Sequence, residues 1–473
     1  MVTMKMQLNR PASLGNSLIA NGNLLTGVAV GDRTIEKWSE LRESAEYLSN
    51  DRIFRLRGRS VVIATIDQFA AAVMLIQLDG IASRIVLYPP DMPREHLTFV
   101  ADTAEADAIF TDQREVESMD RRVEYIVPIG QRRNARDIKC ESLIETEWIL
   151  LTSGTTALPK LVAHTLASLS GAIDRSSPSP MPTVWSTFYD FRRYGGLQIF
   201  LRAALTGASL VLQGVQESAT DFLVRAGAQG VTHISGTPSH WRRALMNSSI
   251  GQMTPTYVRL SGEIADQTIL NQLRLQYPQA RIVHAFASTE AGVAFEVNDG
   301  FAGIPVDTIR HAHTVEMKVE GSTLRVRSSG TASRYLGKEN QNLKDGDGFV
   351  DTGDVLDLRD SRYYFIGRRD GTINVGGLKV HPEEVEAVIN RYPGVSISLV
   401  RTKKNPIVGA LVVADVVLKT PPPQSIEQND QSLQWEILQF CRRELAQHKV
   451  PAMINFVPTL AMSETGKLIR PHA

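Results

Sequence analysis

Hydrophobic and polar positions in the first part of the chain follow two alternating periods. Residues 34–50 have apolar side chains at helical spacing. Residues 60–66 form a short apolar run typical of a buried strand, and 67–78 continue with a helical pattern. Residues 85–88 indicate another strand, which two prolines end. The same alternation continues to His284 and predicts parallel sheets covered by helices.

The pattern changes in the last third of the chain. Residues 315–360 alternate in polarity and are rich in turns, which indicates an antiparallel subdomain. The charged, glycine-bearing segment 367–371 is typical of a joint between domains. Beyond it, the pattern predicts two helices and two strands of a small α+β domain, with the helices at 382–390 and 433–446 and the strands at 395–400 and 407–417.

The sequence thus predicts an α/β protein with two domains. Residues 1–369 form a large N-terminal domain of several subdomains, with parallel sheets under helices and an antiparallel part. Residues 370–473 form the small α+β domain. A chain of 473 residues is long enough for two or three domains.

Composition excludes several classes of protein. Lys+Arg and Asp+Glu are both 51, so the zero net charge disfavours a nucleic-acid or anionic-membrane partner. Cys140 and Cys441 are too few for a disulfide framework or a structural zinc site. The apolar region 61–85 is interrupted by charges, so we expect no membrane span. The polar residues 1–10 do not resemble a signal peptide, and we expect a cytoplasmic protein.

The first candidate for chemistry is the loop at 151–160, which follows an expected strand. It gathers hydroxyl groups, a glycine and a lysine, namely Thr152, Ser153, Gly154, Thr155, Thr156 and Lys160. Backbone N–H groups, hydroxyls and a mobile cation are suited to phosphate oxygens. The segment lacks the Walker pattern, and the alternative is an ordinary surface turn.

Four more motifs follow in order. Thr289 and Glu290, after the strand at 282–284, offer a hydroxyl and a hard oxygen for Mg²⁺. The others are 351–354, which ends in Asp354, the segment 367–386, and 463–470, which contains Lys467. Taken alone, three of them have an ordinary alternative: a helix start, a turn and a solvated tail. The twenty residues at 367–386 are far more specific than any short motif.

Together the five motifs resemble the adenylate-forming superfamily of acyl-CoA ligases, stand-alone adenylation enzymes and luciferases. They run from Leu151 to Arg470. The resemblance implies a C-terminal domain that is mobile relative to the N-terminal one. It also implies a reaction in two halves: a carboxylic acid and ATP give an acyl-adenylate and pyrophosphate, and a thiol, usually that of coenzyme A, then displaces AMP.

The resemblance also implies residue roles. The loop from Thr152 to Lys160 would hold the phosphates, Thr289 would contact the α-phosphate and Glu290 would bind Mg²⁺. Asp354 and Arg368 would bind the ribose. The remaining roles concern the adenine and acyl flank (Ser261, Gly262, Glu263, His284 and Ala285), the hinge (Asp370), the passage for the thiol (Gly376 and Gly377) and the catalytic cation (Lys467).

Some positions depart from the family pattern. Ala157 stands where a second glycine is usual, Phe286-Ala287 replaces Tyr-Gly, and Asn374 replaces a lysine. The charged groups are retained, so these changes concern the geometry of the nucleotide and acyl pockets.

The acyl pocket is expected near Arg193, Tyr194 and Gly195, with His240 and Phe286. Tyr194 stands where amino-acid activators have an aspartate, which disfavours an α-amino acid. Arg192 or Arg193 could pair with a carboxylate or a polar ring substituent of the acid, or both could lie on a solvated helix face. We expect a compact aromatic, heteroaromatic or short modified acid, and we expect His240 to be structural.

The acceptor stays open at this point. The segments at 376–377 and 449–451 are more similar to CoA ligases than to enzymes that load a carrier protein. A carrier-protein thiol or an amine remains an alternative acceptor, and an inactive nucleotide-binding scaffold or a luciferase-like oxygenase is an alternative of another class.

Overall fold

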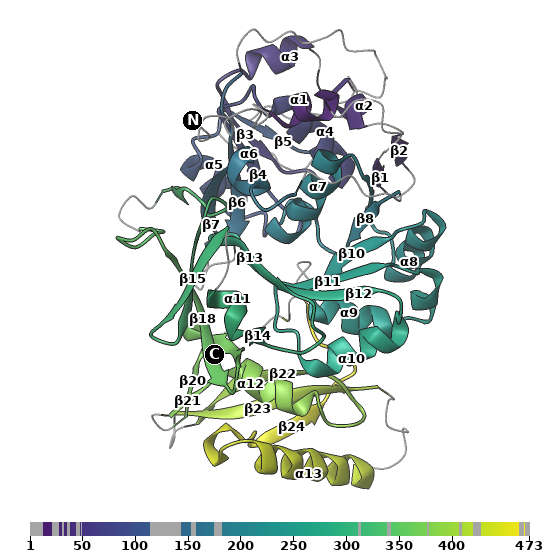
Figure 1. Cartoon of the computed structure of the whole chain (residues 1–473), viewed down its shortest axis with the longest axis vertical. Helices are drawn as coiled ribbons and strands as arrows, with labels where there is room; N and C mark the ends of the chain where they lie inside the picture. The colour runs from purple at the N-terminus through teal and green to yellow at the C-terminus, as the bar shows by residue number, and fades with distance from the viewer. Residues whose placement is uncertain are drawn as a thin grey trace.

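A computed structural model of the chain describes most of its residues (Figure 1), namely 13–20, 28–30, 33–35, 38–43, 48, 50–113, 143–152, 158–174, 182–310, 314–337, 342–375, 378–405, 409–419, 427–462 and 468. Figure 1 shows two helix-covered sheets in the upper and middle parts of the molecule. The antiparallel strands β15 and β18 lie beside them, and the last strands and the long helix α13 lie below.

The first sheet has the strand order β17-β7-β6-β4-β3-β5. Its strands are β3 (Ser60–Ile63), β4 (Arg84–Leu87), β5 (Ala108–Phe110), β6 (Glu147–Thr152), β7 (Lys160–Thr165) and β17 (Arg334–Tyr335). Strands β5, β3, β4 and β6 run parallel, whereas β7 and β17 are antiparallel additions. Strand β7 follows β6 directly, so the loop at 153–159 joins two paired strands.

The second sheet has eight strands in the order β13-β12-β11-β10-β8-β9-β1-β2. They are β1 (Val28–Val30), β2 (Arg33–Ile35), β8 (Val184–Thr187), β9 (Ser209–Leu212), β10 (His233–Gly236), β11 (Tyr257–Ser261), β12 (Arg281–Ser288) and β13 (Gly292–Val297). The central strands are parallel, and β13 returns antiparallel to β12. The parallel, helix-covered sheets confirm the predicted fold class.

Helices cover both sheets because their apolar residues face them. Helix α4 is buried along its whole length, and Asp67 caps it by accepting a hydrogen bond from the Phe69 N–H. The helices of this region are α1 (Leu14–Ala20), α2 (Trp38–Glu43), α3 (Asn50–Arg55), α4 (Gln68–Leu78), α5 (His96–Thr103), α6 (Leu166–Ser170), α7 (Tyr194–Thr206), α8 (Ala219–Ala228), α9 (Pro238–Leu245), the 3-10 helix η1 (Ser248–Gln252) and α10 (Gln267–Gln276).

The antiparallel part predicted for 315–360 is a five-stranded sheet. Its order is β14-β19-β18-β16-β15, with α11 (Val306–Arg310) beside β14 and β15. The strands are β14 (Ile304–Pro305), β15 (Val315–Glu320), β16 (Thr323–Ser328), β18 (Val350–Arg359) and β19 (Arg362–Arg368).

A separate hydrophobic cluster begins at Ile373 and includes residues as far as Ile454. It is built on a sheet in the order β22-β23-β24. The elements after β19 are η2 (Arg369–Gly371), β20 (Ile373–Val375), β21 (Leu378–Val380), α12 (Pro382–Ile389), β22 (Val395–Asn405), β23 (Gly409–Leu418), α13 (Glu427–Glu444), η3 (Gln447–Lys449) and β24 (Met453–Phe456).

The prediction of one helix over 34–50 was wrong. Residues 33–35 form strand β2, which pairs with β1, and helix α2 begins only at Trp38. Trp38 and Leu41 are nevertheless buried. The Trp38 indole N–H donates to the Ala208 carbonyl, 170 residues away. Long-range contacts therefore determine the secondary structure of this segment.

No helix in the described part of the chain is long and apolar enough to cross a membrane.

Asp79, at the end of α4, links this helix to helix α1 and to strand β6 of the first sheet. One carboxylate oxygen accepts from the Leu14 N–H at 2.6 Å and the other from the Trp148 indole at 2.7 Å. Burial raises the pKa of Asp79 to about 6, although both hydrogen bonds oppose the rise. A buried carboxyl depends on such donors, because it has lost its hydration.

Replacing Trp148 with phenylalanine should therefore destabilise the fold, because it removes the indole donor and leaves a smaller ring in a buried place. We expect a loss of about 1–3 kcal/mol, because the Asp79 oxygen keeps no indole donor. Urea unfolding followed by circular dichroism measures this loss. The control is Trp435→Phe on α13, where the side chain is 61% exposed and the same transition should not move. An unchanged midpoint in Trp148→Phe would contradict the assigned role of the bond.

Candidate functional site

The base of the loop after β6 brings Thr152 and Lys160 together. The two residues are register partners across β6 and β7, because the chain leaves one strand and returns along the other. The Lys160 ammonium lies 5.4 Å from the centre of the Tyr335 ring on β17. Ser153, Gly154, Thr155 and Thr156 lie outside the described residues, as do Gly376, Gly377 and Lys467.

Thr289 and Glu290 lie in the turn between β12 and β13, close to Tyr335 on β17. The Tyr335 hydroxyl lies 3.4 Å from Glu290 Oε1. Burial and the neighbouring Glu290 carboxylate raise the pKa of Tyr335, so its hydroxyl remains a proton donor at neutral pH. The base of the loop, the turn and β17 thus lie together. We call this group the junction, and its residues are Thr152, Lys160, Thr289, Glu290 and Tyr335.

A buried histidine fixes this junction, and the sequence analysis missed it. His164 Nε2 lies 2.7 Å from the Thr289 carbonyl oxygen, and Nδ1 lies 3.0 Å from Ser168 Oγ. A carbonyl only accepts, so Nε2 carries the proton and Nδ1 accepts from the hydroxyl. Burial lowers the pKa of His164 to about 4, which keeps the ring neutral. Strand periodicity could have signalled it, because His164 shares a face of β7 with Lys160.

The structure brings the predicted ribose pair together. Asp354 on β18 and Arg368 on β19 are register partners, and their charged groups lie 3.7 Å apart. The Arg368 side chain is 55% exposed, so this ion pair contributes little to stability. A carboxylate and a guanidinium at one sheet edge are suited to bind hydroxyl groups.

Asp370 follows β19 in the short 3-10 helix η2 and is exposed. Its neighbour Arg369 donates to the Asp351 carboxylate at 2.9 Å. Asp351 also lies 3.8 Å from Arg325 on β16, so the antiparallel sheet holds this end of η2.

Ser261, Gly262 and Glu263 follow the end of β11. The Tyr189 hydroxyl donates to the Ser261 carbonyl at 2.6 Å. Gly262 has φ of 84°, a conformation that favours glycine. Glu263 accepts from the Ser239 N–H at the start of α9.

His284 and Ala285 lie on β12, the strand next to β11. Their register partners on β13 are Val297 and Glu296, respectively. His284 Nε2 lies 3.0 Å from the Phe301 carbonyl oxygen, so its ring is held by the chain itself.

The structure rules out a solvated helix face for the two arginines. Arg193 pairs with Asp91 at 2.5 Å and donates to the Leu151 carbonyl. Arg192 is fully buried, pairs with Asp190 and donates to the Thr65 carbonyl. Neither side chain lies on a solvated helix face, and both already have carboxylate partners. They organise the start of α7, a role that a single sequence does not reveal.

The other four expected acyl-pocket residues have different surroundings. Tyr194 begins α7 beside His164, with ring centres 5.9 Å apart. Gly195 lies against the Tyr189 ring, where a Cβ would be 3.4 Å away. His240 stays neutral, with its pKa lowered to about 3 by burial, and accepts from the Thr237 N–H, as expected of a structural residue. Phe286 stacks on Phe295 and Phe365 in another cluster.

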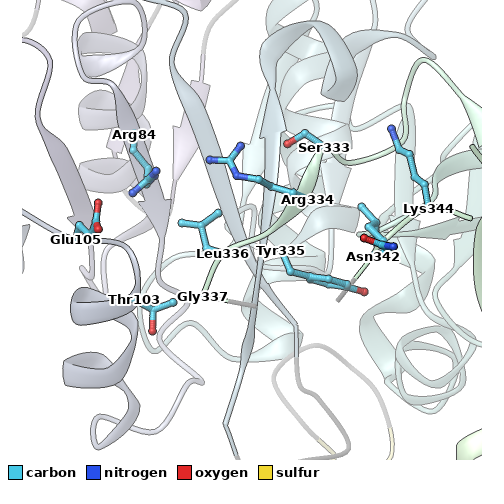
Figure 2. Close-up of a pocket in the computed structure, with 11 residues that line it drawn as sticks. Arg84, Thr103, Glu105, Ser333, Arg334, Tyr335, Leu336, Gly337, Asn342 and Lys344 are labelled. Carbon is cyan, nitrogen blue, oxygen red and sulfur yellow. The ribbon is translucent and has the colours of Figure 1, made fainter. Parts of the chain in front are cut away.

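A cavity of about 420 Å³ adjoins the junction. Figure 2 shows Arg84 and Glu105 on one side of it, Asn342 and Lys344 on the other, and Tyr335 between them. Arg84 and Arg334 both bind Glu147, so the lining is already paired in part. Among the described residues, no group of three or more His, Cys, Asp or Glu side chains could hold a metal ion.

Comparison with known proteins gives two family models and many relatives. The model of the AMP-binding enzyme matches residues 61–332, and that of the AMP-binding enzyme C-terminal domain matches 384–467. An acyl-CoA ligase of Aspergillus oryzae, ppsA, is 26% identical over 80% of this chain and 70% of its own. A 2-succinylbenzoate–CoA ligase of Bacillus cereus is 24% identical over 88% of this chain and 87% of its own.

Among solved structures, a benzoate CoA ligase from Burkholderia xenovorans has the same fold. It superposes with a TM-score of 0.79 over 96% of this chain and 98% of its own, at 18% identity. The matched family model spans more than half of the chain. The chain is therefore an enzyme and belongs to the AMP-binding enzyme family.

Proposed function

We propose that the chain is an AMP-forming acid–thiol ligase. A carboxylate oxygen of the acid attacks the α-phosphorus of ATP, and pyrophosphate leaves. The sulfur of coenzyme A then attacks the acyl carbon, AMP leaves, and the thiol proton passes to solvent. The observation that carries the proposal is the junction of Thr152, Lys160, Thr289 and Glu290, assembled from two sheets.

The junction suits the first half-reaction. Lys160 and the hydroxyls at the loop base would hold the triphosphate, since phosphate binding needs donors and positive charge. Glu290 would bind Mg²⁺ together with phosphate oxygens, because magnesium in such sites usually takes one or two carboxylates and the substrate's own oxygens. Bound Mg²⁺ would neutralise charge that develops on the phosphates.

Asp354 and Arg368 would fix the ribose at the edge of the antiparallel sheet. With the nucleotide held at both ends, the α-phosphorus would lie between the Thr289 turn and the entering acid. The bound geometry would thus supply proximity, which lowers the barrier without any general base.

The names of the relatives support an aromatic acid. Two of the three proteins compared above are named for 2-succinylbenzoate and benzoate. The acyl group would lie between Tyr194 on α7 and the ends of β11 and β12. Coenzyme A is the proposed acceptor because the named relatives are CoA ligases.

Mass spectrometry of reactions with ATP, Mg²⁺ and a panel of aromatic, heteroaromatic and short acids should detect an acyl-CoA when coenzyme A is present. If acyl-AMP forms without a CoA adduct, the proposed adenylation is supported, and the acceptor is a carrier-protein thiol or an amine. Absence of AMP with every acid would contradict the proposal and favour an inactive scaffold.

Lys467→Ala should lower adenylate formation by on the order of 10²–10³, because a cation between two anions stabilises the transition state. Transfer from a supplied acyl-adenylate to coenzyme A should change little. Pyrophosphate release and thioester formation are measured separately. Lys419→Ala, an exposed lysine after β23, is the matched control. Equal loss in both half-reactions would refute the assigned role.

Asp370→Pro should block thioester formation and spare pyrophosphate release. Proline fixes φ near the value of a 3-10 helix, so η2 should form and resist rotation. Asp370→Ala, which leaves the backbone free to rotate, should retain both steps. The hinge role fails when the proline variant forms thioester at the normal rate.

A further inference from the structure

Two arginines share one carboxylate in the layer between α7 and the eight-stranded sheet. Arg259 on β11 lies 3.3 Å from Glu296 Oε1, and Arg202 on α7 lies 3.8 Å from the same oxygen. The Arg259 side chain is 4% exposed and that of Arg202 is 21% exposed. Two positive charges and one negative charge leave a surplus of one positive charge, and the Glu296 side chain that offsets the rest is itself 32% exposed.

Hydrogen bonds that the two arginines leave unformed agree with a surplus of positive charge. The Nε–H groups of Arg202 and Arg259 are buried and have no acceptor within the described part of the chain. Burial, and then the neighbouring Arg259, lower the pKa of the Arg202 guanidinium. Buried cations are normally paired and hydrogen-bonded, so this arrangement lacks an anion.

A second carboxylate that binds two arginines lies elsewhere in the chain, but its surplus positive charge is open to solvent. Glu147 binds Arg84 and Arg334, but the Arg334 side chain is 50% exposed. Water can solvate the surplus charge there. The surplus beside Glu296 includes Arg259, which solvent hardly reaches.

The cluster adjoins the proposed acyl site. Arg259 lies two residues before Ser261 on β11, so both side chains are on one face, about 7 Å apart along the strand. Glu296 is the register partner of Ala285. The Tyr194 hydroxyl lies within the electrostatic influence of both arginines.

Aromatic rings form the next layer of the same face. Trp185, His233 and Tyr257 are register partners on adjacent strands, and ring centres lie 4.7 Å apart for the first two and 5.2 Å for the last two. The Tyr257 hydroxyl lies 3.4 Å from Glu296 Oε2. Along this face of the sheet, Arg259 therefore lies between the proposed reaction centre at Ser261 and the aromatic rings around Tyr257.

We propose that the acid activated by this enzyme carries a second anionic group, such as a carboxylate, which binds Arg202 and Arg259. The inference rests on the proposed function, which locates the acyl group beside Ser261 and Ala285. A guanidinium pair binds a carboxylate through charge-assisted hydrogen bonds, and the anion uses the donors that Glu296 leaves free. Arg192 and Arg193 differ from this pair, because each has a carboxylate of its own, Asp190 and Asp91 respectively.

The test compares acids that differ only in the distal carboxylate. The pairs are 2-succinylbenzoate with 2-butyrylbenzoate, isophthalate with meta-toluate, and glutarate with valerate. Each acid is titrated into the full chain by calorimetry, and ATP-dependent AMP release is measured in parallel. We expect at least one dianionic acid to bind about 10- to 100-fold more tightly than its partner.

Variants separate a binding role from a structural one. Arg259→Met and Arg202→Gln should reduce that preference to near unity. Glu296→Gln should increase it, because it removes the anion that competes for the arginines, and a merely structural ion pair would not give this gain. The matched control is Arg225→Met on α8, where a half-buried arginine binds Glu217. Thermal unfolding verifies that each variant folds. If Arg259→Met does not fold, the preference measured with Arg202→Gln decides between the two roles.

The outcomes keep the two proposals apart. Acids that release AMP without any preference for the dianion overturn this inference and leave the ligase intact. A preference that survives both arginine variants overturns it as well. Preferential binding of a dianion, lost in the variants and without AMP release from any acid, supports the anion site and contradicts the proposed ligase activity. No preferential binding in any pair overturns the inference.

Discussion

The candidate site depends on one hydrogen bond between two sheets. His164 on β7 holds the Thr289 carbonyl, which belongs to the turn after β12. The turn that carries Glu290 is also linked to β7 through the segment before β17: the Ala332 N–H donates to the Glu290 carbonyl at 3.0 Å, and the Ser333 N–H donates to the Ala163 carbonyl at 2.8 Å. A neutral imidazole suits this task, because it donates from one nitrogen and accepts at the other. Burial keeps it neutral, so the bond persists across the physiological pH range.

Much of the fold could be predicted from periodicity. The helical pattern at 67–78 indicated helix α4, and the alternation at 315–360 indicated the antiparallel sheet. Local patterns failed at 33–35, where pairing with β1 makes a strand. That pairing is a tertiary contact and leaves no periodic trace in so short a segment.

The site was predictable where its residues follow strands and unpredictable where partners are distant in the chain. Asp354 and Arg368 lie on adjacent strands, so their meeting follows from the hairpin. His164 and the Thr289 carbonyl are 125 residues apart, and Arg193 and Asp91 are 102 apart. A run of two arginines therefore looked available to a substrate. Arg202 and Arg259, which share one carboxylate and keep buried Nε–H groups without an acceptor in the described part of the chain, come from a helix and a strand with no shared motif.

The bond between Arg369 and Asp351 has a consequence for the proposed rotation at Asp370. Any turn of the chain at that point must either carry Arg369 along and break the bond or pivot just beyond it. An exposed ion pair of this kind is weakened by salt, with a screening length of about 8 Å at physiological ionic strength. Under the proposed rotation, a pivot that carries Arg369 along would have to break this bond, and higher ionic strength would then make the change of conformation between the two half-reactions easier.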